Sequence, residues 1–223
     1  LSSAASDVYK RQDKTYNFYE MIEEQARLCL LNIREKDIVF TVRFLDRFPE
    51  QVSGDYLRVA QIFQNILSNA CKFTEQGTIT LSLHCKMEEG QVWFDGCVED
   101  TGVGMTKEKL AQVFAEYVSF SEDMGVEGFG LGLSIVRQLV EMMHGWVRAE
   151  SDPGKGTRVS FGFYQKQVMA EISEPRNIGR EILKEQNDPQ VEEIQPNWIY
   201  PRARVLLVDD CLLYTSPSPR DGA

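Results

Sequence analysis

Apolar and polar positions along the chain repeat with two different periods, which predict a mixture of helices and strands. Apolar residues three or four positions apart predict helices over residues 19–34, 61–74 and 107–114, and another that opens at Gly132 and runs to Met143. Strict alternation predicts strands. The predicted strands span residues 38–44, 78–84, 91–99, 146–150 and 158–163. We therefore expect an α+β fold: a two-layer α/β sandwich in which a mixed sheet of about five strands carries three helices on one face.

The predicted helix over residues 61–74, QIFQNILSNACKFT, carries a polar stripe. Asn65, Asn69 and Lys72 fall three or four residues apart and therefore share one face. A solvated face would more commonly carry Glu or Lys, because Asn is a weak helix former. Amide oxygens beside a lysine suit a metal ion and an anionic phosphate group. Considered alone, the segment is equally consistent with an amphipathic helix whose asparagines are incidental.

Two glycine segments follow, VEDTGVGM ending at Met105 and EGFGLGLSIV from Glu127 to Val136. In this order, the three segments resemble the ATP-binding domain of sensor histidine kinases, and more widely the ATPases of the gyrase, Hsp90 and MutL group. The resemblance covers residues 14–164, and the K-F-T and L-G-L-S-I-V runs are typical of the histidine kinase branch. It implies the Bergerat or GHKL fold, with ATP held between the helix layer and a lid.

The resemblance also implies roles for particular side chains. Asn69 would ligate Mg²⁺ with support from Asn65, Lys72 would face the phosphates, and Asp100 and Thr157 would bind adenine. The residues implied to shape the nucleotide pocket are Gly102, Gly104, Gly128, Gly130, Leu131, Gly132 and Leu133. Each segment also has a plain structural reading: D-T-G as a turn, the G-x-G-L-G-L glycines as helix–sheet packing, and residues 154–157 as a hairpin turn.

The reaction class implied is phosphoryl transfer to a histidine. His84 and His144 lack the sequence context of a phosphoacceptor. We therefore expect the phosphoacceptor histidine to lie on an upstream helical domain. Asn65 stands where related hydrolytic ATPases carry a Glu that activates water, and an amide cannot act as a general base. No Arg lies between Phe114 and Gly128 to steady the γ-phosphate. Asn65 therefore favours phosphoryl transfer over an ATP-hydrolysing module, which stays as one alternative. The missing arginine leaves open a second alternative, a degenerate domain that binds a nucleotide or partner without catalysis.

Composition limits the classes of partner. The 223 residues carry a formal net charge of −10, which argues against a surface that binds nucleic acid. ATP is also an anion, so this chain would have to bind it through local devices: a metal ion, a lysine, helix N-termini and backbone N–H groups.

The five cysteines include no C-x-x-C pair, so the sequence indicates neither a zinc site nor a disulfide framework. Four of them, Cys29, Cys71, Cys85 and Cys97, fall inside predicted helices or strands and are expected to be small buried thiols. Buried free cysteines without a disulfide framework are typical of proteins in a reducing cytosol. No apolar run reaches the length of a membrane span and no signal peptide is evident, so we expect a cytoplasmic segment, whether or not the parent protein is membrane-anchored.

The two ends of the chain differ in character from its middle. We expect residues 13–166 to be the catalytic domain, 167–202 a flexible linker, and 203–210, ARVLLVDD, the first strand of a truncated receiver domain. Residues 1–12 and 211–223 match nothing in the family and resemble translated cloning sequence. The expected partners are ATP, the upstream phosphoacceptor domain and a response-regulator receiver, and the fragment itself is expected to be monomeric.

Overall fold

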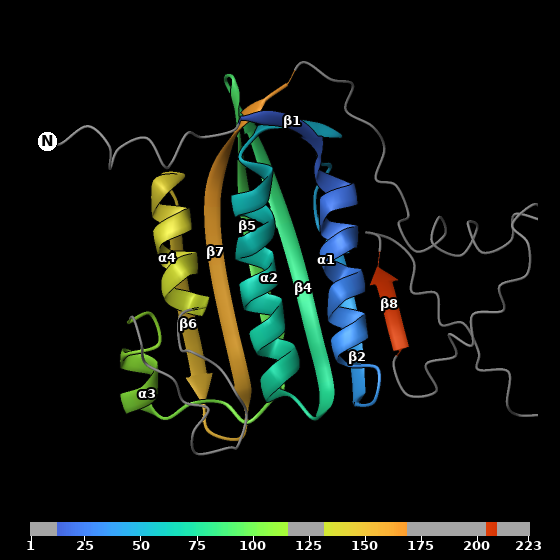
Figure 1. The fold of residues 1–223 in the computed structure, drawn as a ribbon, viewed down its shortest axis with the longest axis vertical. Coiled ribbons are helices and arrows are strands. Elements are labelled where there is room, and N and C mark those ends of the chain that lie inside the picture. The colour runs from blue at the N-terminus through green and yellow to red at the C-terminus, as the bar shows by residue number, and fades with distance from the viewer. Residues whose placement is uncertain (1–12, 116–131, 169–203, 209–223) are drawn as a thin grey trace, which may run out of the picture.

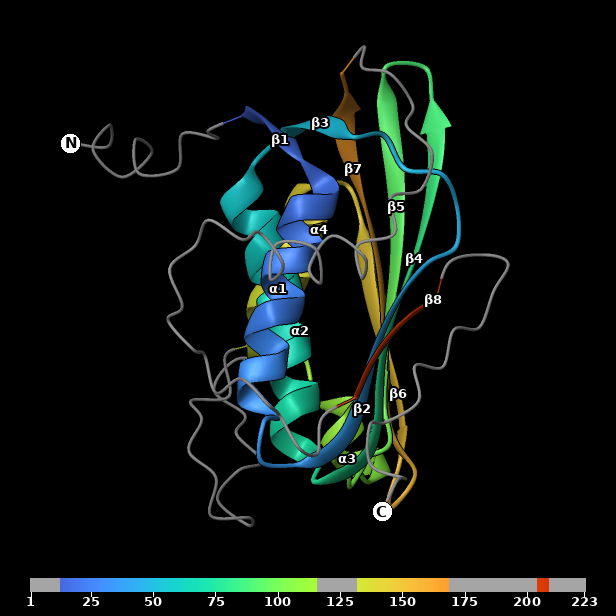
Figure 2. The ribbon, with the colours of Figure 1, turned by 90° about the vertical axis from the view of Figure 1, so that its right-hand side faces the viewer.

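The computed structural model describes residues 13–115, 132–168 and 204–208. These residues form two layers: helices pack on one face of a twisted mixed sheet, and the opposite face carries none of the described helices (Figures 1 and 2). The fold class predicted from the sequence is therefore confirmed. The sheet is larger than expected, because it has eight strands instead of about five.

The strands are β1 Lys14–Asn17, β2 Asp37–Phe44, β3 Gln51–Gly54, β4 Gln76–Glu88, β5 Gln91–Asp100, β6 Trp146–Asp152, β7 Gly156–Gln167 and β8 Arg204–Val208. Their order in the sheet is β1-β3-β7-β5-β4-β2-β8, and β6 pairs with β7 beside β3. The pairs β2–β4 and β2–β8 are parallel and the others are antiparallel, so the sheet is mixed as predicted.

The helices are α1 Phe18–Asn32, α2 Tyr56–Phe73, α3 Lys107–Ala111 and α4 Gly132–Met142. The Asn17 side chain caps α1 by accepting from the backbone N–H groups of Tyr19 and Glu20, and Asp55 caps α2 by accepting from Arg58. The Asp55 cap explains why α2 begins before the predicted Gln61. The three long helices α1, α2 and α4 cover the sheet, whereas α3 lies at one end (Figure 1).

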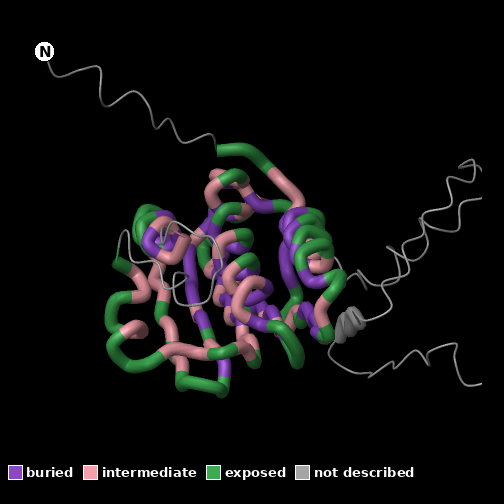
Figure 3. The backbone as a smooth tube through the Cα atoms, turned by 60° about the horizontal axis from the view of Figure 1, so that its bottom comes forward, coloured by how far each residue is buried: buried purple, intermediate pink, exposed green. Residues whose placement is uncertain are grey.

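The core fills the space between the two layers. Buried positions gather on the facing sides of helices and sheet, and exposed positions lie on the outer sides and in the loops (Figure 3). Its centre is aromatic: Phe94 of β5 stacks on Phe18 of α1 with ring centroids 4.3 Å apart, and Phe63 of α2 meets Phe161 of β7 edge to face at 5.3 Å. The apolar side of α2 that the sequence predicted is buried at Ile62, Phe63, Ile66, Leu67 and Ala70.

Two strands, β1 and β3, were not predicted, whereas β8 falls within the strand predicted over residues 203–210. Strands β1 and β3 have four residues each, too few for an alternating pattern to be distinctive, and they exist by pairing with each other. Strand β8 lies in the segment predicted to start a receiver domain, and here its backbone pairs with the edge of β2. Other differences concern length: β4 continues to Glu88 instead of ending at His84, and α3 ends at Ala111, followed by turns.

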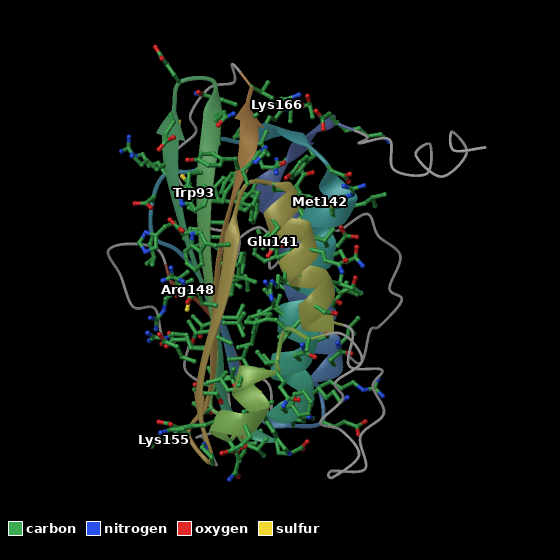
Figure 4. All side chains as sticks on the ribbon, turned by 90° about the vertical axis from the view of Figure 1, so that its left-hand side faces the viewer. Trp93, Glu141, Met142, Arg148, Lys155 and Lys166 are labelled. Carbon is green, nitrogen blue, oxygen red and sulfur yellow. The ribbon has the colours of Figure 1, made fainter. Side chains whose placement is uncertain are left out.

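The face of the sheet opposite the helices is polar and aromatic. Trp93 and Arg148 lie on this outer face, whereas Glu141 and Met142 belong to α4 on the helix side (Figure 4). The indole N–H of Trp93 donates to Asp95 over 2.8 Å. The thiols of Cys85 and Cys97 are only half-buried, so of the four cysteines expected to be buried the prediction is confirmed for Cys29 and Cys71 alone.

Candidate functional site at one end of the sandwich

The predicted nucleotide-site residues that the structure describes lie toward one end of the molecule. The C-terminal end of α2, the end of β5 and the start of β7 lie at the bottom of Figure 1, and the N-terminal end of α4 points toward the same end. Lys155, in the turn between β6 and β7, marks the same end in Figure 4, and Lys166 marks the opposite one. Segments far apart in sequence are therefore neighbours here.

Helix α2 presents its asparagines toward the start of α4. Asn65 and Asn69 are half-buried, one turn apart, on the side of α2 that meets α4. A Cβ atom placed on Gly132 would lie 3.6 Å from Asn69 Nδ2 and 3.9 Å from Asn65 Cγ. These are ordinary van der Waals distances, so packing against the asparagines does not itself require a glycine here. The structure thus brings three predicted site residues from two helices together.

The side-chain amide of Asn65 has a donor without a partner. Its Nδ2 atom is buried and has no hydrogen-bond partner in the part of the chain that the structure describes. Leaving a buried donor unpaired costs about 1–3 kcal/mol. An acceptor oxygen from a ligand or a water molecule would remove that cost.

The C-terminal end of α2 is firmly anchored. The Lys36 ammonium donates to the carbonyl oxygens of Cys71 and Thr74 over 2.8 and 3.0 Å and to the Glu75 carboxylate over 2.9 Å. A cation at this position also complements the negative end of the helix dipole. Lys72 follows Asn69 by three residues, and its Nζ atom lies 5.2 Å from the centroid of the Phe73 ring. The Lys72 side chain is half-buried and lies in the last turn of α2, one turn beyond Asn69.

Asp100 ends β5 with one carboxylate oxygen already engaged. Its Oδ1 atom accepts hydrogen bonds from the backbone N–H groups of Gly102 at 2.9 Å and Thr157 at 3.2 Å. Burial raises the pKa of the Asp100 carboxyl above its usual value, and these two bonds oppose that rise only in part. The carboxylate is therefore oriented by the backbone, with its second oxygen, Oδ2, outside those two bonds.

The loop after Asp100 joins α2 to the β6–β7 hairpin. Gly102 lies so close to α2 that a Cβ there would be 2.3 Å from the Phe73 carbonyl oxygen. Gly104 has φ +64, and a Cβ there would be 2.0 Å from the Asp152 carbonyl oxygen. Both glycines are thus required by geometry, one by close approach and one also by its backbone conformation. Two backbone hydrogen bonds hold the loop between them: Val103 N–H donates to the Phe73 carbonyl, and Gly154 N–H donates to the Val103 carbonyl.

Ser151, which no pattern in the sequence singled out, lies at the centre of this junction. Its hydroxyl accepts from the Met105 N–H over 2.8 Å, donates to the Gly156 carbonyl over 2.8 Å and lies 3.0 Å from the Thr157 hydroxyl. Ser151 is partly buried and precedes a D-P-G turn. The only signal in the sequence was a serine at the end of an alternating strand, which does not distinguish it from a surface residue.

Several predictions fall outside the described residues. They concern Gly128, Gly130 and Leu131, and the stretch between Phe114 and Gly128 that lacks an arginine, of which residues 116–127 are not described. Leu133 is described: it is partly buried and packs against the core. His84 lies within β4, with its Nδ1 atom 2.9 Å from the Asp46 carboxylate, and His144 follows α4 with φ 56. Neither histidine lies at this end of the sandwich.

Two absences hold for the described part of the chain. No helix there is both long and apolar enough to cross a membrane. No group of three His, Cys, Asp or Glu side chains there could hold a metal ion.

Comparison with known proteins agrees with this geometry. Residues 54–167, which include α2, β5 and β7, match the family model described as histidine kinase-, DNA gyrase B- and HSP90-like ATPase. The aerobic respiration control sensor protein ArcB of Escherichia coli K12 is 30% identical over 191 residues, which are 84% of this chain and 24% of ArcB. Hybrid signal transduction histidine kinase B of Dictyostelium discoideum is 34% identical over 151 residues, which are 66% of this chain and 8% of that protein. The chain thus corresponds to a small part of each relative.

The fold is also found among solved structures. Full-length ShkA, solved in complex with AMPPNP, superimposes with a TM-score of 0.60 at 23% sequence identity. The match covers 91% of this chain and 42% of ShkA.

Proposed function

Because the chain belongs to the family of histidine kinase-, DNA gyrase B- and HSP90-like ATPases, we propose that it is the ATP-binding catalytic domain of a hybrid sensor histidine kinase. In this proposal, residues 13–166 bind Mg-ATP and donate its γ-phosphoryl group to a histidine on an upstream helical domain. The observation that carries the proposal is the meeting of the α2 asparagines, the α4 N-terminus and the Asp100–Thr157 pair at one end of the sandwich.

Asp100 and Thr157 would hold the adenine ring. Asp100 is kept in place by two backbone hydrogen bonds, so its free oxygen can accept from the exocyclic amino group of adenine without first being ordered. A hydrogen bond to a charged group contributes about 1.5–3 kcal/mol, which corresponds to about 10- to 100-fold in affinity. Gly102 and Gly104 would let the backbone come close to the base.

The α2–α4 boundary would hold the phosphates. Asn69 and Lys72 offer an amide oxygen and an ammonium group from α2, and Gly132 brings the N-terminal end of α4 beside Asn69. A helix N-terminus has outward N–H groups and a favourable dipole for an anion. A bound Mg²⁺ would neutralise charge on the phosphate oxygens, with Asn69 as its protein ligand. Gly128, Gly130, Leu131 and Leu133 complete the proposed phosphate-side set.

Asn65 favours transfer to histidine over hydrolysis by this domain. It lies one turn before Asn69 and faces the same boundary, where a hydrolytic enzyme needs a base that activates water. An amide cannot take that proton. In the transfer, the bond between the γ-phosphorus and the β–γ bridging oxygen breaks and a P–N bond forms to the imidazole. ADP takes the electron pair, and the imidazole proton passes to solvent.

The phosphoryl group would then pass to an aspartate of a receiver domain. The hybrid kinase from Dictyostelium among the relatives supports a kinase that carries or serves such a receiver. Residues 203–210 are proposed as the start of one, after a linker over residues 167–202. The extended conformation of Arg204–Val208 supports this proposal.

The test is calorimetric titration of the whole chain with ATP, with and without Mg²⁺. We expect Mg²⁺-dependent binding that Asn69→Ala weakens about tenfold or more. The matched control is Gln64→Ala, an exposed neutral side chain on the same helix, which should leave the affinity unchanged. Equal effects of both substitutions would contradict the role of Asn69.

A second measurement separates the alternatives. The chain is mixed with a histidine-containing acceptor domain and γ-labelled ATP, and phosphohistidine and free phosphate are both quantified. Phosphohistidine with little free phosphate supports the kinase. Free phosphate that is produced without an acceptor supports an ATPase module, and ATP binding with neither product supports a degenerate domain.

A further inference from the structure

Three neighbouring strands place Asp100, Thr157 and Ser151 in one row. In the sheet register, Thr157 of β7 is paired with Asp100 of β5 on one side and with Ser151 of β6 on the other. The row continues the helix-facing side of the sheet, because the residues two positions further into each strand, Val98, Val159 and Ala149, belong to or pack against the core. All three side chains therefore lie on the face where the nucleotide is proposed to bind.

The hydroxyl of Ser151 can be assigned a direction. A hydroxyl group has one proton to donate and two lone pairs to accept with. The Gly156 carbonyl, 2.8 Å away, can only accept, so the Ser151 proton points to it. The Met105 N–H, also 2.8 Å away, can only donate, and it occupies one lone pair. The second lone pair is left for Thr157, 3.0 Å away.

The proton of the Thr157 hydroxyl is therefore directed at Ser151. Thr157 then has no proton to offer a ligand and presents only the lone pairs of its oxygen. Asp100 also has no proton to offer a ligand, because an ionised carboxylate can only accept hydrogen bonds. The two residues of the row that would contact the base thus both require hydrogen-bond donors from it.

We propose that Ser151 is a positioning residue that sets base specificity: by holding the Thr157 proton, it makes this edge of the pocket accept hydrogen bonds only. An adenine base offers an amino group at its 6-position and satisfies the edge. A hypoxanthine or guanine base offers a carbonyl oxygen there and is rejected, because two acceptors would face each other. The inference rests on the proposed nucleotide site and adds a residue that does not itself contact the base.

The test compares ATP with inosine triphosphate, whose base has a carbonyl in place of the 6-amino group. The measured quantity is the ratio of their dissociation constants, determined by calorimetry with Mg²⁺ for the wild type and Ser151→Ala. Without the serine, the Thr157 hydroxyl is free to turn and donate. We expect the preference for ATP to fall by about tenfold, the equivalent of one hydrogen bond. Ser151→Thr keeps the hydroxyl and should restore the wild-type ratio.

Two further variants control for a general loss of structure. Ser160→Ala removes a partly buried serine of β7 whose hydroxyl contacts Cys97 on the outer face, and it should leave the ratio unchanged. In a Thr157→Val background, Ser151→Ala should no longer change the ratio, because the hydroxyl through which it acts is absent.

The outcomes are distinguishable. If Ser151→Ala weakens both nucleotides by the same factor, Ser151 only supports the loop and the proposal is overturned. The same conclusion holds if the ratio changes equally with and without the Thr157 hydroxyl. If the folded wild type binds neither nucleotide, the proposed function itself fails, and the inference fails with it.

Discussion

The backbone N–H of Thr157 donates a hydrogen bond of 3.2 Å to the Oδ1 atom of Asp100, across two strands whose residues are 57 positions apart in the chain. The Gly102 N–H donates to the same oxygen over 2.9 Å. A carboxylate that would bind a ligand is therefore oriented before the ligand arrives. Its burial raises its pKa, so the same arrangement holds a charge in a place where the charge is unfavourable.

Replacing Asp100 by Asn should separate ligand affinity from stability. The amide oxygen of Asn can still accept both backbone hydrogen bonds, and the buried charge is gone, so the free energy of unfolding at pH 7 should be at least that of the wild type. ATP affinity should fall about 10- to 100-fold because a charged hydrogen bond is lost. Calorimetry and urea denaturation of the same preparations measure the two quantities.

The matched control for that variant is Asp95→Asn. Asp95 lies on the same strand, but on the outer face, where it accepts from the Trp93 indole N–H. It should not change ATP affinity. A variant of Asp100 that loses stability and keeps its affinity would mean that the carboxylate serves the fold and not the nucleotide.

The raised pKa of Asp100 predicts opposite pH dependences for binding and stability. As pH falls through this pKa, the carboxylate is protonated and ATP binding weakens, beginning above the ordinary aspartate value of about 3.9. The folded state binds this proton more tightly than the unfolded state does. The stability that Asp100 contributes is therefore fully present below about pH 3.9, and it is lost as the pH rises through the folded-state pKa.

The contribution of one group to these profiles is found by subtraction. Titrations with ATP and urea denaturation are run as pH series on the wild type and Asp100→Asn. The difference between the two proteins should show affinity increasing with pH and stability decreasing with pH. Parallel profiles for the two proteins would rule out this carboxyl as the source.

Lys36→Met should weaken the end of α2. The ammonium group donates to two carbonyl oxygens at the end of the helix, those of Cys71 and Thr74, and to the Glu75 carboxylate. Removing it leaves buried or partly buried acceptors with fewer partners, and we expect the free energy of unfolding to fall by about 1–3 kcal/mol. Urea denaturation measures the change.

The comparison variant is Lys86→Met, whose ammonium group makes an exposed pair with Glu88. An exposed ion pair contributes at most about 1 kcal/mol, so this variant should stay close to the wild type. If the two lysine variants lose the same amount, the Lys36 contacts do not stabilise α2 in solution.

The described cysteines should resist alkylation in the native protein. Cys29 and Cys71 are buried, with their Sγ atoms 2.7 Å apart between α1 and α2, and their mutual contact and burial raise the pKa of Cys29. Burial raises the pKa of Cys85 to about 12 and raises that of Cys97. Thiolates are the reactive form, so iodoacetamide at pH 8 should label these four sites slowly in buffer and rapidly in urea.

Peptide mapping by mass spectrometry measures the extent of alkylation at each cysteine separately. Rapid native labelling at Cys71 would show that α1 and α2 separate readily, against the packing described here. Rapid labelling at Cys85 alone would indicate only that its strand end opens.

Local periodicity was sufficient to predict the parts of the fold that depend on neighbouring residues. The spacing of Asn65, Asn69 and Lys72 already placed them on one side of α2, because a helix repeats every 3.6 residues whatever surrounds it. Alternation likewise identified the middle of β4, β5 and β7, and Asp100 at a strand end. The order of the three motifs was enough to indicate the family.

Tertiary structure decided which of these elements meet. Backbone hydrogen-bonding groups are alike along the chain, so alternation does not say which strand pairs with which, or in what register. That register makes neighbours of Asp100, Thr157 and Ser151, and it creates the four-residue strands β1 and β3. The sequence could not predict the role of Ser151 for this reason. Its three polar neighbours come from the loop after β5 and from β7, and they approach it only when the sheet is assembled.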